Sequence, residues 1–433
     1  MTTINFKDEL AKRESELLTQ LARVIAVPSV QGPAKPEAPF GPGPKQALTT
    51  VMEIAANMGF ATHVVNDCVG WVQYGTGTDY IAVLGHLDVV AAGTGWATDP
   101  FVLTIKDDYM YGRGTLDNKG PIMGALFALQ MIKDQKMTLK HPIRLIFGTN
   151  EESGSADMPY YNQAEPAPIA GFTPDCKYPV VYAERGLLGI RLSQRINDGS
   201  LKTIQGITGD FNGSYIPDEA TVTLANGAVR HYHGKKSPSN APELGVNVIA
   251  QLARDLQQLP GQTGAFMQWL TRVMQDTTGR AFGFEYQDQA SGTTQYSLSV
   301  MTKTATTLSV ELRIRYPVTE KRAQLLTAIK AALPTAVELE IISDYASSYH
   351  DPTLPMIQIM QRTYEAVMGT DGTPVTTTGV TYARSLPNIV AFGPSFPGQR
   401  GIAHKENEWL KLSDWRKMIQ IDYDTMQALA NQI

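Results

Sequence analysis

Apolar and polar residues follow two different periods along the first 190 residues of the chain. Apolar residues at helical spacing predict helices near 5–26, 44–58 and 119–134, and short apolar runs predict strands near 61–66, 70–74, 80–85 and 143–149. Because strands that alternate with helices of this length usually form a sheet covered on both faces, we predict an α/β domain. Ligands of such sheets generally bind at the carboxyl ends of the strands.

The pattern changes between residues 188 and 346. Strand-like segments surround two helical stretches, near 243–258 and 320–332, which predicts a separate α+β domain. The α/β pattern then returns with a helix near 353–367, the strand NIVAFG and a closing helix near 412–430. We therefore expect one discontinuous domain, residues 1–187 and 347–433, into which residues 188–346 are inserted.

Charge and composition exclude some partners. The 433-residue chain carries 37 Lys+Arg against 42 Asp+Glu, a formal net charge of −5, and no dense basic cluster, so nucleic acid is not an expected partner. The first segment is polar and amphipathic, and no run of about 18 uncharged apolar residues occurs, so we expect no membrane association and a cytoplasmic location. Cys68 and Cys176 are typical of reduced thiols in such a protein.

The first candidate for chemistry follows the strand near 80–85, where the chain reads His86-Leu87-Asp88. Side chains two residues apart on a strand share a face, so Asp88 could accept a hydrogen bond from the His86 imidazole and fix its tautomer. Carboxylates act in this way on metal-binding histidines. By itself, a His-x-Asp pair more often has a structural role.

Further acidic residues stand beside predicted helix and strand ends. Asp117, in YGRGTLDNKGP, directly precedes a helix, where either Asp117 or Asn118 could simply cap the helix. Glu151 and Glu152 follow the strand near 143–149, and side chains of adjacent residues diverge, so one could bind a metal ion while the other faces a water. The alternative is a solvated loop that carries two acids.

Asp175, in GFTPDCKYP, and His404, in GIAHKENE, add one more acid and one more imidazole. Together with His86, Asp117 and Glu152 they offer nitrogen and oxygen ligands without a thiolate. That set suits paired Zn²⁺ or similar divalent ions that share one carboxylate and one water.

Five blocks of the sequence, taken together, resemble a known family. They are GHLDVV, DDYMYGRGTLDNKGP, NEESGS, GFTPDCKYPVVYAERG, and the segment from FGPSFPG to AHKENE. In order and spacing they are similar to the dinuclear metallopeptidases that include acetylornithine deacetylase, succinyl-diaminopimelate desuccinylase, carnosinases and the bacterial dipeptidase V group. The resemblance covers nearly the whole chain. It implies a phosphorylase/hydrolase-like catalytic domain with a central mixed sheet, plus an inserted α+β lid domain.

The resemblance also implies a set of metal ligands. His86 and Asp175 would bind one ion, Glu152 and His404 would bind the other, and Asp117 would bridge the two.

Two catalytic roles come from the same resemblance. Glu151 would be the general base that takes a proton from the metal-bridging water and later gives it to the departing amine. Asp88 would orient His86. The peptide bond between Asp117 and Asn118 would be cis.

Within the expected lid, NAPELGVN and LRIRYPV resemble signatures of the dipeptidase V group. Arg315, in the second block, would bind a substrate carboxylate through its planar guanidinium, with a surface ion pair on a strand as the alternative. Gly379 and His233 are further candidates for substrate contacts.

Two lid positions depart from the family pattern. Pro238 stands where many relatives have a histidine, and Ser214 stands where an asparagine is expected. His231 or His233 could replace the missing histidine, but exposed strand histidines are the more common case.

The sequence therefore predicts a metal-dependent exopeptidase that cleaves dipeptides or short peptides with two divalent ions, zinc first and Mn²⁺ or Co²⁺ as alternatives. An N-acyl amino acid deacylase with the same metal centre is the second hypothesis. A catalytically silent metal- or peptide-binding protein is the third, motivated by Pro238 and Ser214, although Glu151 and all the predicted ligands are present. Both a monomer and a homodimer remain open.

Overall fold

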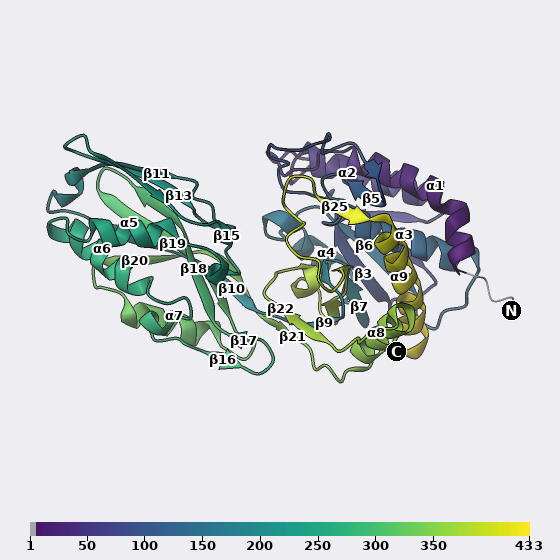
Figure 1. Ribbon diagram of the computed structural model, residues 1–433. Helices are drawn as coiled ribbons and strands as arrows, with labels where there is room; N and C mark the ends of the chain where they lie inside the picture. The colour runs from purple at the N-terminus through teal and green to yellow at the C-terminus, as the bar shows by residue number, and fades with distance from the viewer. Residues whose placement is uncertain (1–5) are drawn as a thin grey trace. The chain divides into compact units, whose positions relative to one another are not determined.

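The computed structural model describes residues 6–433, and its internal contacts divide them into two units (Figure 1). The first unit runs to Tyr182 and resumes with His350–Val375 and Thr381–Ile433. The second unit consists of Ala183–Tyr349 and Thr376–Val380, and the expected lid, residues 188–346, falls inside it. Residues 1–5 of the expected first domain, including the first residue of the helix expected near 5–26, lie outside the described residues.

A mixed sheet forms the centre of the first unit. Its strands pair in the order β1 (Thr62–Val65), β2 (Val69–Tyr74), β6 (Ile143–Gly148), β3 (Ile81–His86), β7 (Ala170–Thr173), β23 (Ile389–Ala391) and β9 (Val181–Glu184). β3 is parallel to β6 and β7, and β7 is parallel to β23, whereas β1, β2 and β9 run antiparallel to their neighbours. Every residue of β3 and β6 is buried, as expected for strands covered on both faces. The predicted α/β class with a central mixed sheet is confirmed.

Helices cover this sheet. They are α1 (Phe6–Ile25), α2 (Pro42–Asn57), α3 (Lys119–Asp134), α4 (Met158–Ala164), α8 (Pro355–Met368) and α9 (Leu412–Gln432). α3 is buried along most of its length because it packs against β3, α1 and α9 (Figure 1). The helix carries Gly124 where it meets α9, because a Cβ there would lie 3.1 Å from Trp415 Nε1.

Short strands hold the loops around the sheet. β4 (Thr104–Lys106), β5 (Tyr109–Tyr111) and β25 (Trp409–Lys411) form a three-stranded sheet, and β8 (Cys176–Lys177) pairs with β24 (Pro394–Ser395). The chain leaves the first unit within β9, whose last residues pair with β21 (Ser348–Tyr349), and it returns at His350, directly after β21. It leaves the first unit again within β22 (Val375–Thr377) and returns at Thr381.

The second unit has its own sheets and its own apolar core. Its four-stranded antiparallel sheet has the order β18 (Gln295–Lys303), β19 (Thr307–Tyr316), β10 (Gly186–Arg195) and β20 (Val337–Tyr345). A three-stranded sheet contains β11 (Ile204–Gly209), β13 (Glu219–Leu224) and β14 (Val229–His233), and β12 (Tyr215–Ile216) pairs with β15 (Ser237–Pro238). A further short ladder joins β16 (Gln287–Asp288) to β17 (Gly292–Thr293).

Three helices complete the second unit, namely α5 (Val248–Leu256), α6 (Gly261–Val273) and α7 (Arg322–Ala332). The sequence predicted only the first and the last of them. α6 contains Gly261 and Gly264, which lower helix propensity, yet Phe266, Leu270 and Val273 fall on one buried face. Tertiary packing of that face outweighs the weak local preference.

Within residues 6–433, no helix combines the length and the apolar character needed to cross a membrane. Cys68 and Cys176 are free thiols, as predicted.

Candidate metal centre

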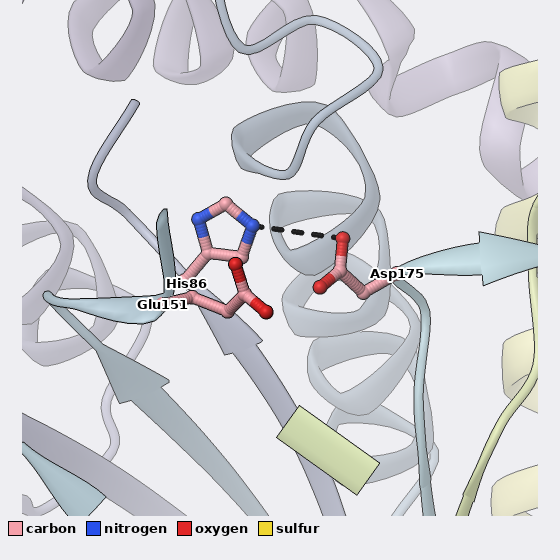
Figure 2. A group of neighbouring side chains, drawn as sticks. All are labelled: His86, Glu151 and Asp175. Carbon is pink, nitrogen blue, oxygen red and sulfur yellow. Dashed lines mark ion pairs between the residues drawn. The ribbon is translucent and has the colours of Figure 1, made fainter. Parts of the chain in front are cut away.

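Three neighbouring parallel strands end at one edge of the first unit's sheet, and each leads to a predicted site residue. β3 ends with His86, β6 is followed by Glu151 and Glu152, and β7 is followed by Asp175. Because β6, β3 and β7 are adjacent and parallel, their carboxyl ends meet. Figure 2 shows the side chains of His86, Glu151 and Asp175 pointing toward one another.

The carboxylate of Asp117 lies between the two predicted histidines. Its Oδ1 is 3.1 Å from His86 Nε2, and its Oδ2 is 2.9 Å from His404 Nε2. Each imidazole nitrogen also faces a second acid: His86 Nε2 lies 3.5 Å from Asp175 Oδ1, and His404 Nε2 lies 3.1 Å from Glu152 Oε1. The structure thus brings together all five residues expected as metal ligands.

Glu408, which is buried, and Asn118, the residue after Asp117, hold the loop around Asp117 in place. Glu408 Oε1 accepts hydrogen bonds from the backbone N–H groups of Gly114, Leu116 and Asp117. The side chain of Asn118 donates to Pro174 O and accepts from His86 N. Although Asn118 stands at the N-cap of α3, its side chain makes no capping bond, and the peptide bond between Asp117 and Asn118 is cis, as expected.

The carboxylate of Asp88 binds the backbone of the two glutamates rather than the His86 imidazole, for which it was expected. Its Oδ1 accepts from Glu151 N and its Oδ2 accepts from Glu152 N, each at 3.1 Å. His86 Nδ1 lies 2.9 Å from the main-chain oxygen of Asp88 and 3.5 Å from its Oδ1. A hydrogen bond to that carbonyl places a proton on Nδ1, so Nε2 is the nitrogen that can bind a cation or, when it is protonated, donate to the acids.

The acids raise the pKa of both imidazoles. Burial alone would lower the pKa of His86, but the charge of Asp175 and the hydrogen bond with Asp117 raise it well above its usual value. The His404 side chain is 44% exposed; its partial desolvation opposes protonation, yet hydrogen bonds with Asp117 and Glu152 raise its pKa to about 12. The cluster therefore stabilises positive charge at the two Nε2 atoms.

The pKa values of the acids shift in opposite directions. Burial would raise the pKa of Asp117, but the hydrogen bonds of both histidines lower it. Burial and the charge of Asp175 raise the pKa of Glu151 well above its usual value. Burial likewise raises the pKa of Glu152, and it raises the pKa of Asp175 to about 7. Acids this close together cannot all be ionised without more positive charge nearby.

The residues present fit divalent cations. Two sets of side chains bring three ligand atoms within 4.8 Å of one another, namely His86, Glu151 and Asp175, and His86, Asp117 and Glu152. Glu152 Oε1 is buried and lies 3.1 Å from His404 Nε2, so this oxygen and that nitrogen could bind the same cation. Imidazole nitrogen and carboxylate oxygen are ligands that Zn²⁺, Mn²⁺ and Co²⁺ accept. The first set shows that Glu151 lies as close to His86 as a ligand would.

The predicted substrate residues lie in the second unit. Arg315, on β19, donates from Nη1 to Thr378 O at 2.5 Å, so it lies beside the segment that contains Gly379. Gly379 N donates to Thr377 Oγ1. His233 lies at the end of β14 with an exposed side chain.

The two positions that depart from the family pattern are neighbours in the fold. Tyr215 pairs with Pro238 between β12 and β15, and Ser239 N donates to the main-chain oxygen of Ser214. His231 is exposed on β14, where its Nδ1 lies 3.1 Å from Thr221 Oγ1.

Three residues around the centre escaped the sequence analysis. Glu408 supports Asp117, and Asp157 and Tyr382 bind the backbone that leads to Glu151. Glu408 is the last residue of the block AHKENE that contains His404, and this position was a usable signal. Asp157 and Tyr382 offered none, because they are joined across 225 residues of sequence.

The chain is similar to known peptidases in sequence and in fold. A model of peptidase family M20/M25/M40 matches residues 82–428 of the chain. The protein named "Putative dipeptidase YtjP" of Bacillus subtilis (strain 168) is 30% identical over 451 residues, which cover 95% of this chain and 96% of that protein.

Two solved structures have the same fold. Human carnosine dipeptidase 1 matches with a TM-score of 0.65 at 14% identity, over 99% of this chain and 98% of that chain. The di-peptidase Dug1p from Saccharomyces cerevisiae matches with a TM-score of 0.64 at 15% identity, over 98% of both chains. Since the family match spans every predicted ligand, from His86 to His404, the chain belongs to peptidase family M20/M25/M40.

Proposed function

We propose that this chain is a dipeptidase that works with two divalent metal ions, zinc being the first candidate. His86 and Asp175 would hold one ion, Glu152 and His404 the other, and Asp117 both. The observation that carries the proposal is the carboxylate of Asp117, which turns one oxygen toward each of two imidazole nitrogens. Two sites that share one carboxylate are what a paired-ion centre requires.

When bound, such ions polarise the peptide carbonyl and lower the pKa of water. Glu151 would carry out the proton transfers. Its carboxylate lies beside His86 and Asp175, and burial raises its pKa, so it is suited to take a proton and release it again. Glu151 would take the proton of the attacking water and then give it to the departing amine. Asp88, which binds the backbone N–H groups of Glu151 and Glu152, would fix this base in place.

The substrate class follows from the second unit and from the relatives. Arg315 would bind the carboxylate at the end of a small peptide, because its planar guanidinium matches that group. Gly379, in the segment that Arg315 contacts, and His233 would line the same substrate. The B. subtilis relative is named as a dipeptidase, which supports a short peptide as the substrate.

The test uses the full-length protein, stripped with EDTA and reloaded with Zn²⁺, Mn²⁺ or Co²⁺. A pool of dipeptides, tripeptides and N-acyl amino acids is added, and products are followed by mass spectrometry. We expect free amino acids from dipeptides, only after metal is restored. Glu151→Gln, which keeps the size of the side chain, should bind the same amount of metal and lose turnover.

Two other outcomes would contradict the dipeptidase proposal. Cleavage confined to N-acyl amino acids would overturn the dipeptidase assignment in favour of a deacylase. Metal binding without cleavage of any compound, in wild type and Glu151→Gln alike, would favour a binding protein.

A further inference from the structure

The loop that carries Glu151 and Glu152 is bound along its backbone by buried side chains. Asp157 Oδ2 accepts from Thr149 N at 2.7 Å, and the hydroxyl of Tyr382 accepts from Asn150 N at 3.4 Å. Asp88 accepts the next two backbone N–H groups. Every N–H group from residue 149 to residue 152 therefore has a side-chain acceptor.

Tyr382 connects this loop to Asp157 and to His86, one of the proposed metal ligands. Its hydroxyl, which accepts from Asn150 N, also donates to Asp157 Oδ2 at 2.6 Å. Its ring meets the His86 imidazole edge-on, with centroids 6.1 Å apart at 82°. Tyr382 and Asp157 are both completely buried, so neither hydrogen bond competes with solvent.

The end of β6 is shaped around this arrangement. A Cβ atom on Gly148 would collide with the hydroxyl of Tyr382 and would lie 2.7 Å from Asp157 Oδ2. Glycine at this strand end thus lets the hydroxyl and the acid reach the backbone of the next two residues.

We propose that Tyr382 is a positioning residue of the metal centre. It acts through Asp157 and Asn150 to fix the backbone from which Glu151 and Glu152 project, and its ring limits the rotation of His86. This inference rests on the proposed function, because it assigns Tyr382 to the same reaction. Partners one layer behind metal ligands typically change metal affinity or activity by about 10- to 100-fold when they are removed.

The test compares Tyr382→Phe with Tyr80→Phe. Tyr80 is also completely buried in the first unit, and its hydroxyl donates to Pro166 O, away from the site. For each variant we would measure the thermal midpoint, the Kd for Mn²⁺ by calorimetry on EDTA-treated protein, and kcat and KM on a cleaved dipeptide.

We expect both variants to lose some thermal stability. Tyr382→Phe alone should lose about 10- to 100-fold in kcat and bind Mn²⁺ more weakly, with KM changed by less than about threefold. Unchanged kcat and Kd in Tyr382→Phe, or equal losses in Tyr80→Phe, would overturn the inference. A wild-type protein that neither binds Mn²⁺ nor cleaves dipeptides would instead overturn the proposed function.

A second pair of variants covers the case in which Tyr382→Phe does not fold. Asp157→Asn keeps one oxygen that can accept from both Thr149 N and Tyr382, whereas Asp157→Ala keeps none. We expect kcat to fall in Asp157→Ala and to be largely preserved in Asp157→Asn. Equal kcat values in the two variants would contradict the positioning role.

Discussion

Glu408 accepts a hydrogen bond from the backbone N–H of Asp117, which lies 291 residues earlier in the chain. The other oxygen of Glu408 accepts from Arg113 Nη1 at 2.6 Å, and both side chains are buried. Burial raises the pKa of Glu408 to about 7 despite this partner. A residue near the end of the chain thus fixes the loop that presents Asp117, the proposed shared ligand.

Glu408→Gln should weaken both the fold and the metal centre. The amide retains one oxygen for the backbone N–H groups, but it leaves Arg113 buried without an anionic partner. Breaking a buried pair in this way costs about 3–5 kcal/mol. We expect urea unfolding of EDTA-treated protein to show that loss and Mn²⁺ titration to show about 10-fold weaker binding. Glu406→Gln, at an exposed position two residues earlier, is the matched control and should resemble wild type. Equal behaviour of the two variants would refute the role of Glu408.

Asp422 should make the protein less stable as pH rises. The side chain lies on α9, completely buried, and neither carboxylate oxygen has a hydrogen-bond partner among residues 6–433. Burial raises its pKa well above the usual value, so the folded state keeps a proton that the unfolded chain releases above about pH 4. This contribution to stability is complete below that pH and is lost as pH rises toward the folded-state pKa, by about 1.4 kcal/mol per pH unit.

Asp422→Asn removes this titration. The free energy of unfolding of the variant, relative to that of wild type, should therefore increase with each pH unit above about 4. Denaturant unfolding of EDTA-treated proteins at several pH values between 4 and 7 measures the difference. Asp107→Asn, at an exposed turn, should show no such trend. A constant difference between Asp422→Asn and wild type would show that the carboxyl group ionises normally in the folded protein.

The approach of His86, Glu151 and Asp175 could be predicted because it depends on a general property of sheets, whereas the ligand roles of Asp117 and His404 came from the family resemblance. His86, Glu151 and Asp175 each follow an apolar strand, and carboxyl ends of adjacent parallel strands meet whatever the rest of the chain does. The supporting residues could not be predicted in this way. Tyr382 and Asp157 meet across 225 residues, and no local pattern encodes that contact.

In the fold, too, local sequence patterns predicted some elements, whereas others depend on packing between distant segments. Mainly apolar runs predicted β3 and β6, although Arg144 interrupts the run of β6, since strands buried on both faces are largely apolar. α6 was missed because Gly261 and Gly264 obscure its helical period, and only packing in the second unit's core reveals the buried face.

Arg315→Ala should raise KM far more than it lowers kcat, if Arg315 binds the substrate carboxylate. A charged hydrogen bond is worth about 1.5–3 kcal/mol, or about 10- to 150-fold in kcat/KM. The sharper readout compares a dipeptide with its C-terminal amide. Wild type should prefer the free carboxylate strongly, and the preference should disappear in Arg315→Ala.

Arg313→Ala controls for loss of a guanidinium from the same face of β19, where Arg313 lies 3.4 Å from Glu311. It should keep the preference for a free carboxylate. A preference that persists in Arg315→Ala would mean that another group binds the carboxylate and that Arg315 serves mainly to hold Thr378.

Divalent ions should stabilise the EDTA-treated protein, and Asp117 should be required for the effect. Glu151, Glu152 and Asp175 crowd one edge of the sheet, where burial raises the pKa of each, so added positive charge relieves their repulsion. Zn²⁺ at about 100 times its Kd would add about 2.7 kcal/mol for each occupied site and raise the thermal midpoint by several degrees. Asp117→Asn should abolish most of this rise, because its one remaining oxygen cannot serve two ions, whereas Asp107→Asn should leave it intact. A midpoint that does not respond to Zn²⁺, or a response equal in Asp117→Asn, would contradict a shared carboxylate between two sites.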